Sequence, residues 1–194
     1  MSLPRLLVLT DRAQLPLGRS LTQAVFACAR AGATHFVVRE LDLSSTQREA
    51  LVTSLAQIPG IVLITARSRL PGSSGVHLAS AQDDDGAAGI RGRSCHDEAE
   101  VRQAVSDGAS YLTISPAAPS DSKPGYGPPL GPSGVRHLVG AANGTPVFAL
   151  GGVTSGNARS FRDAGAYGIA VMGSLMRSGD PGAMTERLLA EVNG

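Results

Sequence analysis

The sequence is poor in several residue types, and each shortage argues against a class of protein. It contains one lysine, Lys123, and every other permanently cationic side chain is arginine. Its two cysteines, Cys28 and Cys95, are too few to hold a chain of 194 residues together, so we expect reduced thiols and a cytoplasmic location. No apolar run approaches the roughly 20 residues that span a membrane, and residues 1–5 lack the layout of a signal peptide.

The chain also lacks an excess of charge of either sign. The formal net charge is +1 and the isoelectric point is near 7.9, so we expect no basic surface for nucleic acid or an anionic membrane. Small anionic ligands remain compatible with this balance. Hydrophobic residues make up 42% and charged residues 17%, which predicts one domain over residues 1–194 with a sizeable core.

The order of apolar and polar segments predicts alternating strands and helices. Short runs of branched apolar residues are followed by glycine or hydroxyl residues and then by a helical pattern, and such runs suit strands buried on both faces. Eight strands are expected, at 6–10, 35–39, 61–65, 76–79, 90–94, 111–115, 146–150 and 168–172. Helices are expected near 20–30, 46–57, 97–106, 133–142, 155–164 and 181–192, whereas 68–74 and 80–89 are too short for complete helices.

Three glycines mark the points where a helix ends and the next strand begins. Gly32, Gly108 and Gly165 each precede an alanine and a predicted strand, and glycine is the residue best able to adopt a left-handed helix cap. Eight such units in a chain of this length predict a compact (β/α)₈ TIM barrel with shortened helices after the third and fourth strands. A doubly wound open sheet is the main rival.

Glycine and hydroxyl residues cluster where a barrel of this kind often binds phosphate. Gly151-Gly152 follows the predicted seventh strand and Gly173-Ser174 the eighth, where bare backbone amides can approach phosphate oxygens. Lys123 adds a flexible ammonium in a loop rich in serine, glycine and proline. A solvated lysine and ordinary turn glycines are the alternatives. Together the three features favour a phosphate monoester ligand.

His96 is the best candidate for proton transfer. Imidazole titrates nearest neutrality, and His96 follows the predicted fifth strand at the active face, although a histidine at a helix start is often a capping or surface residue. His77 is the only competitor. Cys95 is a poor nucleophile candidate because adjacent strand residues point to opposite faces. The acidic run 83–85 could ligate a divalent metal but is more often a solvated turn.

Several segments resemble the thiamine phosphate synthase and TenI superfamily over nearly the whole chain. The resemblance implies a TIM barrel that acts on a phosphorylated thiazole in thiamin biosynthesis, with the lysine loop and both glycine turns around the phosphate. The matching segments are 9–12, 38–40, 75–78, 92–96, 115–116, 120–125, 130–131, 149–153 and 168–172.

Departures from the synthase pattern bear on which activity of the superfamily is present. The synthase's second strand typically ends in Gln-x-Arg-Glu-Lys-Asp, whereas residues 37–42 read Val-Val-Arg-Glu-Leu-Asp. The Asn-Asp pair after strand three is replaced by Ala66-Arg67, and the Gln-x-Asp element after strand four by residues 79–82. Losing a lysine and a metal ligand weakens neutralisation of a diphosphate. The string 93–96, Arg-Ser-Cys-His, is similar to the TenI-type thiazole tautomerase instead.

The resemblance therefore favours an isomerase that aromatises a thiazole carboxylate phosphate without metal or organic cofactor. In this hypothesis His96 is acid and base, and Arg39, Arg67 and Ser94 bind the rest of the substrate. The phosphate is expected at Ser120, Ser122, Lys123, Gly151, Gly152, Gly173 and Ser174. The alternatives are a magnesium-dependent synthase that couples hydroxymethylpyrimidine diphosphate to thiazole phosphate, or a non-catalytic barrel that binds thiazole phosphate. Whether subunits pair, and whether Asp83 or Asp84 binds metal, stays open.

Overall fold

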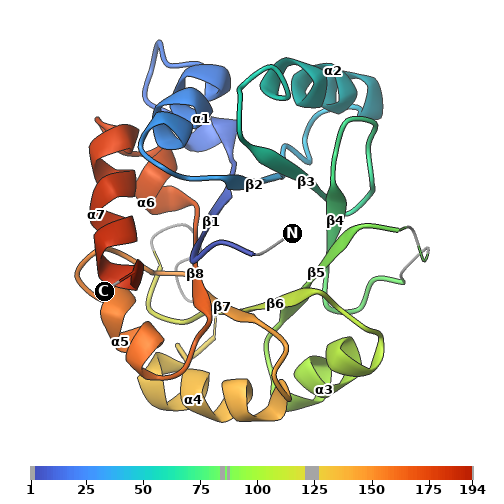
Figure 1. Ribbon diagram of the computed structural model, residues 1–194, viewed down its shortest axis with the longest axis vertical. Helices are drawn as coiled ribbons and strands as arrows, with labels where there is room; N and C mark the ends of the chain where they lie inside the picture. The colour runs from blue at the N-terminus through green and yellow to red at the C-terminus, as the bar shows by residue number, and fades with distance from the viewer. Residues whose placement is uncertain (1–2, 84–85, 87, 121–126, 194) are drawn as a thin grey trace.

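The structure is a closed barrel of eight parallel strands in sequence order (Figure 1). It is a computed structural model that describes residues 3–83, 86, 88–120 and 127–193. β1 pairs with β2 and also with β8, as in the pairs Leu7–His35 and Leu7–Ala170, which excludes the open sheet. The strands are β1 Leu6–Leu9, β2 His35–Val38, β3 Val62–Ala66, β4 Gly75–Leu78, β5 Ile90–Cys95, β6 Tyr111–Ile114, β7 Val147–Leu150 and β8 Gly168–Val171. The predicted TIM barrel is confirmed.

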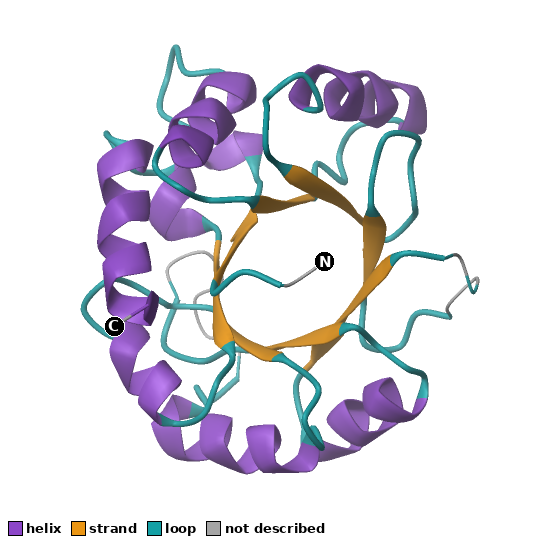
Figure 2. Cartoon of the chain, viewed as in Figure 1, coloured by secondary structure: helices purple, strands orange, loops and turns teal. Residues whose placement is uncertain are grey.

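Helices surround the strands on the outside of the barrel (Figure 2). All six predicted helices are present: α1 Leu21–Arg30, α2 Ser45–Leu55, α3 Glu98–Ser106, α4 Gly131–Ala141, α5 Ala158–Asp163 and α7 Pro181–Asn193. The 3₁₀ helix η1 Arg12–Gln14 and the four-residue α6 Gly173–Met176 were not predicted. Both are too short to produce a detectable apolar period.

The connections after β3 and β4 are loops where shortened helices were expected. Residues 67–74 form turns, and no helix occurs in the described residues between Leu78 and Ile90. The first loop closes on its own strand because the Thr65 hydroxyl donates to the carbonyl of Ser68 over 2.8 Å. These two connections leave the adjoining part of the barrel without a covering helix, as Figure 2 shows beside β4 and β5.

Side chains of each strand alternate between two apolar layers. One layer lies inside the barrel and includes Leu7, Val37, Tyr111 and Phe148, while the other lies between strands and helices and includes Cys95. Because successive strand residues face opposite sides, Ser94 shares the inner side with Gly92 while Cys95 faces outward. Burial, and secondarily Glu100, raises the pKa of Cys95 to about 12, so its thiol stays protonated at neutral pH.

In the described portion of the chain, no helix has the length and apolar character needed to cross a bilayer.

Candidate active site at the barrel mouth

Two arginines lie where β2 and β3 end. Arg39 directly follows β2; its backbone N–H donates to the Thr10 hydroxyl over 3.2 Å, and its Nη1 lies 2.8 Å from the sulfur of Met172, just after β8. Arg67 follows β3 and is exposed. Within the described part of the chain neither guanidinium pairs with a carboxylate. The mouth therefore carries positive charge on two neighbouring strand ends.

Arg67 holds an unusual backbone conformation. Its φ is 70°, in the left-handed region that side chains other than glycine rarely adopt. Its N–H donates to the carbonyl of His77 over 2.9 Å, and its carbonyl accepts from the side-chain amide of Gln82. These bonds fix the turn after β3 against the end of β4.

His77 lies inside the barrel beneath these arginines. Its Nδ1 is 3.0 Å from the Tyr111 hydroxyl, and its Nε2 is 3.0 Å from the Ser94 hydroxyl and 3.4 Å from that of Thr113. Burial lowers the pKa of His77 to about 3, with smaller contributions from Arg39, Arg67 and Arg93. A ring that stays neutral at physiological pH is a poor proton carrier, which removes His77 as a competitor of His96.

His96 lies at the same end of the barrel, just after β5. Its N–H donates to Glu100 over 2.7 Å, and Asp97 caps α3 by accepting from the Glu100 N–H. Its Nδ1 lies 2.9 Å from the carbonyl oxygen of Ser115. A carbonyl only accepts, so the neutral ring carries its proton on Nδ1 and leaves the lone pair on Nε2.

The turns after β7 and β8 lie together. Ser174 Oγ donates to the carbonyl of Val153 over 2.6 Å, which ties the two turns to each other. Gly151 and Gly152 have φ of 92° and 66°, and a Cβ on Gly152 would lie 2.2 Å from the carbonyl oxygen of Pro119. The segment that leads to Ser120 therefore passes directly over the β7 turn. Ser122 and Lys123, also expected at the phosphate, lie outside the described residues.

Arg177 is a candidate that the sequence interpretation missed. A Cβ on Gly173 would lie 2.4 Å from Arg177 Nη1, so this guanidinium packs against the bare backbone of the β8 turn. Its Nη1 also donates to the side chain of Gln14. The signal available in the sequence was an arginine one helical turn after Gly173.

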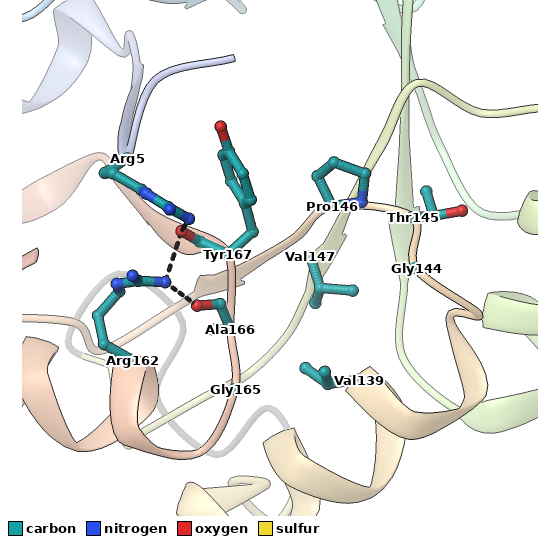
Figure 3. Close-up of a pocket in the computed structure, with 10 residues that line it drawn as sticks. All are labelled: Arg5, Val139, Gly144, Thr145, Pro146, Val147, Arg162, Gly165, Ala166 and Tyr167. Atoms are coloured by element: carbon teal, nitrogen blue, oxygen red, sulfur yellow. Dashed lines mark hydrogen bonds between the residues drawn. The ribbon is translucent and has the colours of Figure 1, made fainter. Parts of the chain in front are cut away.

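A cavity of about 420 Å³ lies at the opposite end of the barrel (Figure 3). It is lined by residues that precede strands, among them Arg5, Pro146 and Tyr167. Arg5 and Arg162 both donate to the carbonyl of Tyr167, over 2.7 and 2.6 Å, and the Arg5 guanidinium lies 4.1 Å from the centre of the Tyr167 ring. These guanidiniums brace the backbone before β8. Active sites of TIM barrels occupy the other face, so we assign this cavity a structural role.

Comparison with known proteins identifies the family of this chain. The family described as "Thiamine monophosphate synthase" matches residues 6–175. The chain belongs to this family. The match begins in β1 and ends within α6, so it includes all eight strands and every turn described above.

Individual members of the thiamine monophosphate synthase family match over nearly the full chain. A "Thiamine-phosphate synthase" from Chloroflexus aurantiacus is 35% identical over 97% of this chain and 93% of its own length. One from Salinispora tropica is 33% identical over 97% of each chain. The solved "Thiamine phosphate pyrophosphorylase" from Pyrococcus furiosus superposes with a TM-score of 0.84 at 25% identity, covering 97% of this chain and 95% of its own.

These relatives overturn the expected isomerase activity. We expected a thiazole tautomerase because residues 37–42, 66–67 and 79–82 depart from the synthase pattern. The relatives at 33–35% identity are nevertheless named thiamine-phosphate synthase, so that interpretation is wrong and the transferase alternative is better supported. The departures are confined to three strand ends, whereas the similarity to synthases extends over nearly the whole chain.

The resemblance to synthases implies magnesium, which proteins usually bind through one or two carboxylates together with the phosphates of a substrate. Among residues 3–83, 86, 88–120 and 127–193, no group of three histidine, cysteine or acidic side chains is placed to hold a metal ion. Glu40 is buried directly after Arg39, and its Oε1 has no hydrogen-bond partner in the described residues, whereas β3 is followed by Arg67 and Asp83 is exposed. Asp84 lies outside the described residues.

Proposed function

We propose that this member of the thiamine monophosphate synthase family is a thiamine-phosphate synthase. It joins hydroxymethylpyrimidine diphosphate to thiazole phosphate and releases diphosphate. The observation that carries the proposal is the pair of arginines, Arg39 and Arg67, at neighbouring strand ends with no carboxylate partner in the described residues. A site that binds two phosphorylated substrates needs such positive charge.

Arg39 and Arg67 are assigned to the diphosphate. When the carbon–oxygen bond to this group breaks, the electron pair stays on the diphosphate and negative charge grows there. Fixed guanidiniums stabilise that charge more strongly in a partly buried mouth than in bulk water. Arg39 is half-buried and Arg67 exposed, so Arg39 is expected to contribute more.

The thiazole phosphate is assigned to the turns after β7 and β8. The backbone at Gly151, Gly152, Gly173 and Ser174 can approach phosphate oxygens closely, and Ser120 reaches the same region through the segment over Gly152. The Ser174 hydroxyl donates to Val153, so Ser174 would contribute its backbone N–H. Ser122 and Lys123 complete the expected set.

His96 is assigned to the reacting heterocycles between these two anion sites, and Ser94, on the inner side of β5, to the diphosphate. The Nδ1 of His96 lies 2.9 Å from the Ser115 carbonyl oxygen, which holds the imidazole at the mouth where a heterocycle would bind. This role orients a substrate and replaces the acid–base role expected for tautomerisation.

Genetic complementation tests the proposed function. A bacterium that lacks its own thiamine-phosphate synthase should grow without added thiamine phosphate when it expresses this chain, and the Arg39→Met variant should restore growth poorly. The Chloroflexus aurantiacus relative serves as the positive control. Failure to restore growth by a soluble, well-expressed chain, while the relative succeeds, would contradict the proposal.

A further inference from the structure

A histidine and a tyrosine meet inside the barrel across an intervening strand. His77 on β4 is in register with Gly92 on β5, and Gly92 is in register with Tyr111 on β6. A Cβ on Gly92 would lie 2.2 Å from Tyr111 Cζ and 2.4 Å from His77 Nδ1. The two rings, with centroids 5.5 Å apart and planes at 22°, can therefore meet only because the middle strand carries no side chain there.

Ser94 continues this row toward the mouth. It lies two residues after Gly92 on the same face of β5, and its hydroxyl is 3.0 Å from His77 Nε2. Within the described chain Ser94 has no hydrogen-bond partner other than His77. The order from the core outward is thus Tyr111, His77, Ser94.

The direction of the hydrogen bonds follows from counting protons. Tyr111 is fully buried, and His77 Nδ1 is its hydroxyl's only partner in the described residues. Burial raises the pKa of Tyr111, so the hydroxyl keeps its proton, and a buried donor without an acceptor is costly. Tyr111 therefore donates to Nδ1. The single proton of neutral His77 is then on Nε2 and is donated to Ser94 Oγ.

We propose that His77 and Tyr111 are positioning residues that fix the Ser94 hydroxyl as a hydrogen-bond donor to an anionic oxygen of the bound substrate. Because Ser94 Oγ accepts from His77, its own hydrogen remains for a ligand in the mouth. Arg39 and Arg67 mark that ligand as anionic, and its identity as a diphosphate rests on the proposed function. The Thr113 hydroxyl oxygen lies 3.4 Å from His77 Nε2 and can accept from the same N–H. This second acceptor does not change the assignment of the His77 proton to Nε2.

Nitrogen-detected NMR of the histidine rings tests the direction without any substrate. The chain has four histidines, and the variants His35→Asn, His96→Asn and His137→Asn assign their signals by elimination. The proposal predicts that His77 is protonated on Nε2 and stays neutral from about pH 8 to about pH 5, where an ordinary histidine titrates. A proton on Nδ1, or titration within that range, would overturn it.

Binding of inorganic pyrophosphate, measured by calorimetry, tests the consequence. Ser94→Ala and Tyr111→Phe should each weaken binding about 3- to 10-fold, the worth of one hydrogen bond, and the double variant should be no weaker than Ser94→Ala alone. Tyr167→Phe is the control. It removes a partly buried phenol hydroxyl that donates to the Leu3 carbonyl, away from Tyr111, His77 and Ser94, so this variant should bind pyrophosphate as the parent does. Thermal unfolding checks that Tyr111→Phe remains folded.

Two outcomes separate this inference from the proposed function. The proposed positioning of Ser94 by Tyr111 and His77 is refuted if Ser94→Ala binds pyrophosphate normally, or if the affinity losses of Ser94→Ala and Tyr111→Phe multiply in the double variant. This holds even when the parent protein makes thiamine phosphate. If the parent makes no thiamine phosphate but both variants lose pyrophosphate affinity as predicted, the positioning of Ser94 is supported and the proposed synthase reaction is contradicted.

Discussion

Arg39 Nη1 lies 2.8 Å from the sulfur of Met172, so the end of β2 contacts the end of β8 across β1 at the mouth. A sulfur is a weak acceptor and does not neutralise a guanidinium. The contact holds the Arg39 side chain in place and leaves its charge available to an anionic ligand.

Arg39→Met should weaken pyrophosphate binding about 10- to 100-fold, because a charge-assisted hydrogen bond contributes about 1.5–3 kcal/mol. Calorimetry measures the affinity directly. Arg187→Met is the matched control: Arg187 is exposed on α7, also lies near a methionine sulfur, and should bind pyrophosphate as the parent does. Equal affinity of the Arg39 variant and the parent would remove Arg39 from the site.

Arg67→Gly should separate stability from ligand binding. Glycine adopts the φ of 70° without strain, so the free energy of unfolding should rise by up to about 1 kcal/mol, while pyrophosphate affinity falls. Asn143→Gly tests the same backbone effect at a second non-glycine residue with positive φ, 46°, and should leave affinity unchanged. Chemical denaturation and calorimetry give the two values. Unchanged pyrophosphate affinity in Arg67→Gly would remove Arg67 from the anion site.

Gly92→Ala should destabilise the barrel by about 1–3 kcal/mol or more, because its Cβ would overlap Tyr111 and His77 in a closely packed interior. Gly140→Ala is the control in α4, where a Cβ meets no atom within 4 Å. That change should stabilise the protein by about 0.5–1 kcal/mol, as alanine does in helices. Urea denaturation distinguishes the two, and a Gly92 variant as stable as the parent would contradict the described packing.

Acid should destabilise the protein through His77. Its pKa is about 3 in the folded state and about 6.5 when unfolded, so below pH 6.5 the unfolded chain binds a proton that the folded chain does not. The contribution of His77 to stability is therefore greatest above pH 6.5 and falls as pH decreases toward 3, by about 1.4 kcal/mol per pH unit. Denaturation at several pH values should show a smaller slope in His77→Asn. An identical slope in the parent and His77→Asn would mean that His77 is not buried as described.

The fold could be predicted from the sequence because most strands are short buried runs followed by glycine or hydroxyl residues. β4 and β5 could be predicted despite the missing helices around them, because each is itself a short run bounded by glycine or hydroxyl residues. The short elements η1 and α6 span less than one and a half helical turns and left no periodic signal.

The site could be predicted only in part. Residues directly after strands, such as Arg39, Arg67 and His96, could be found because parallel strands end at one face. Tyr111 could not, because it lies 34 positions from His77 and meets it only through the register of β4, β5 and β6. The reaction was misassigned because residues 37–42, 66–67 and 79–82 depart locally from the synthase pattern, whereas the similarity to synthases extends over nearly the whole chain.

The coupling reaction itself is the most direct test of the account. Purified protein is incubated with hydroxymethylpyrimidine diphosphate, thiazole phosphate and magnesium, and the phosphorus NMR spectrum is followed over time. We predict that thiamine phosphate and free diphosphate appear in equal amounts as both substrates disappear. Persistence of both substrates, under conditions in which the Chloroflexus aurantiacus relative consumes them, would contradict the assignment.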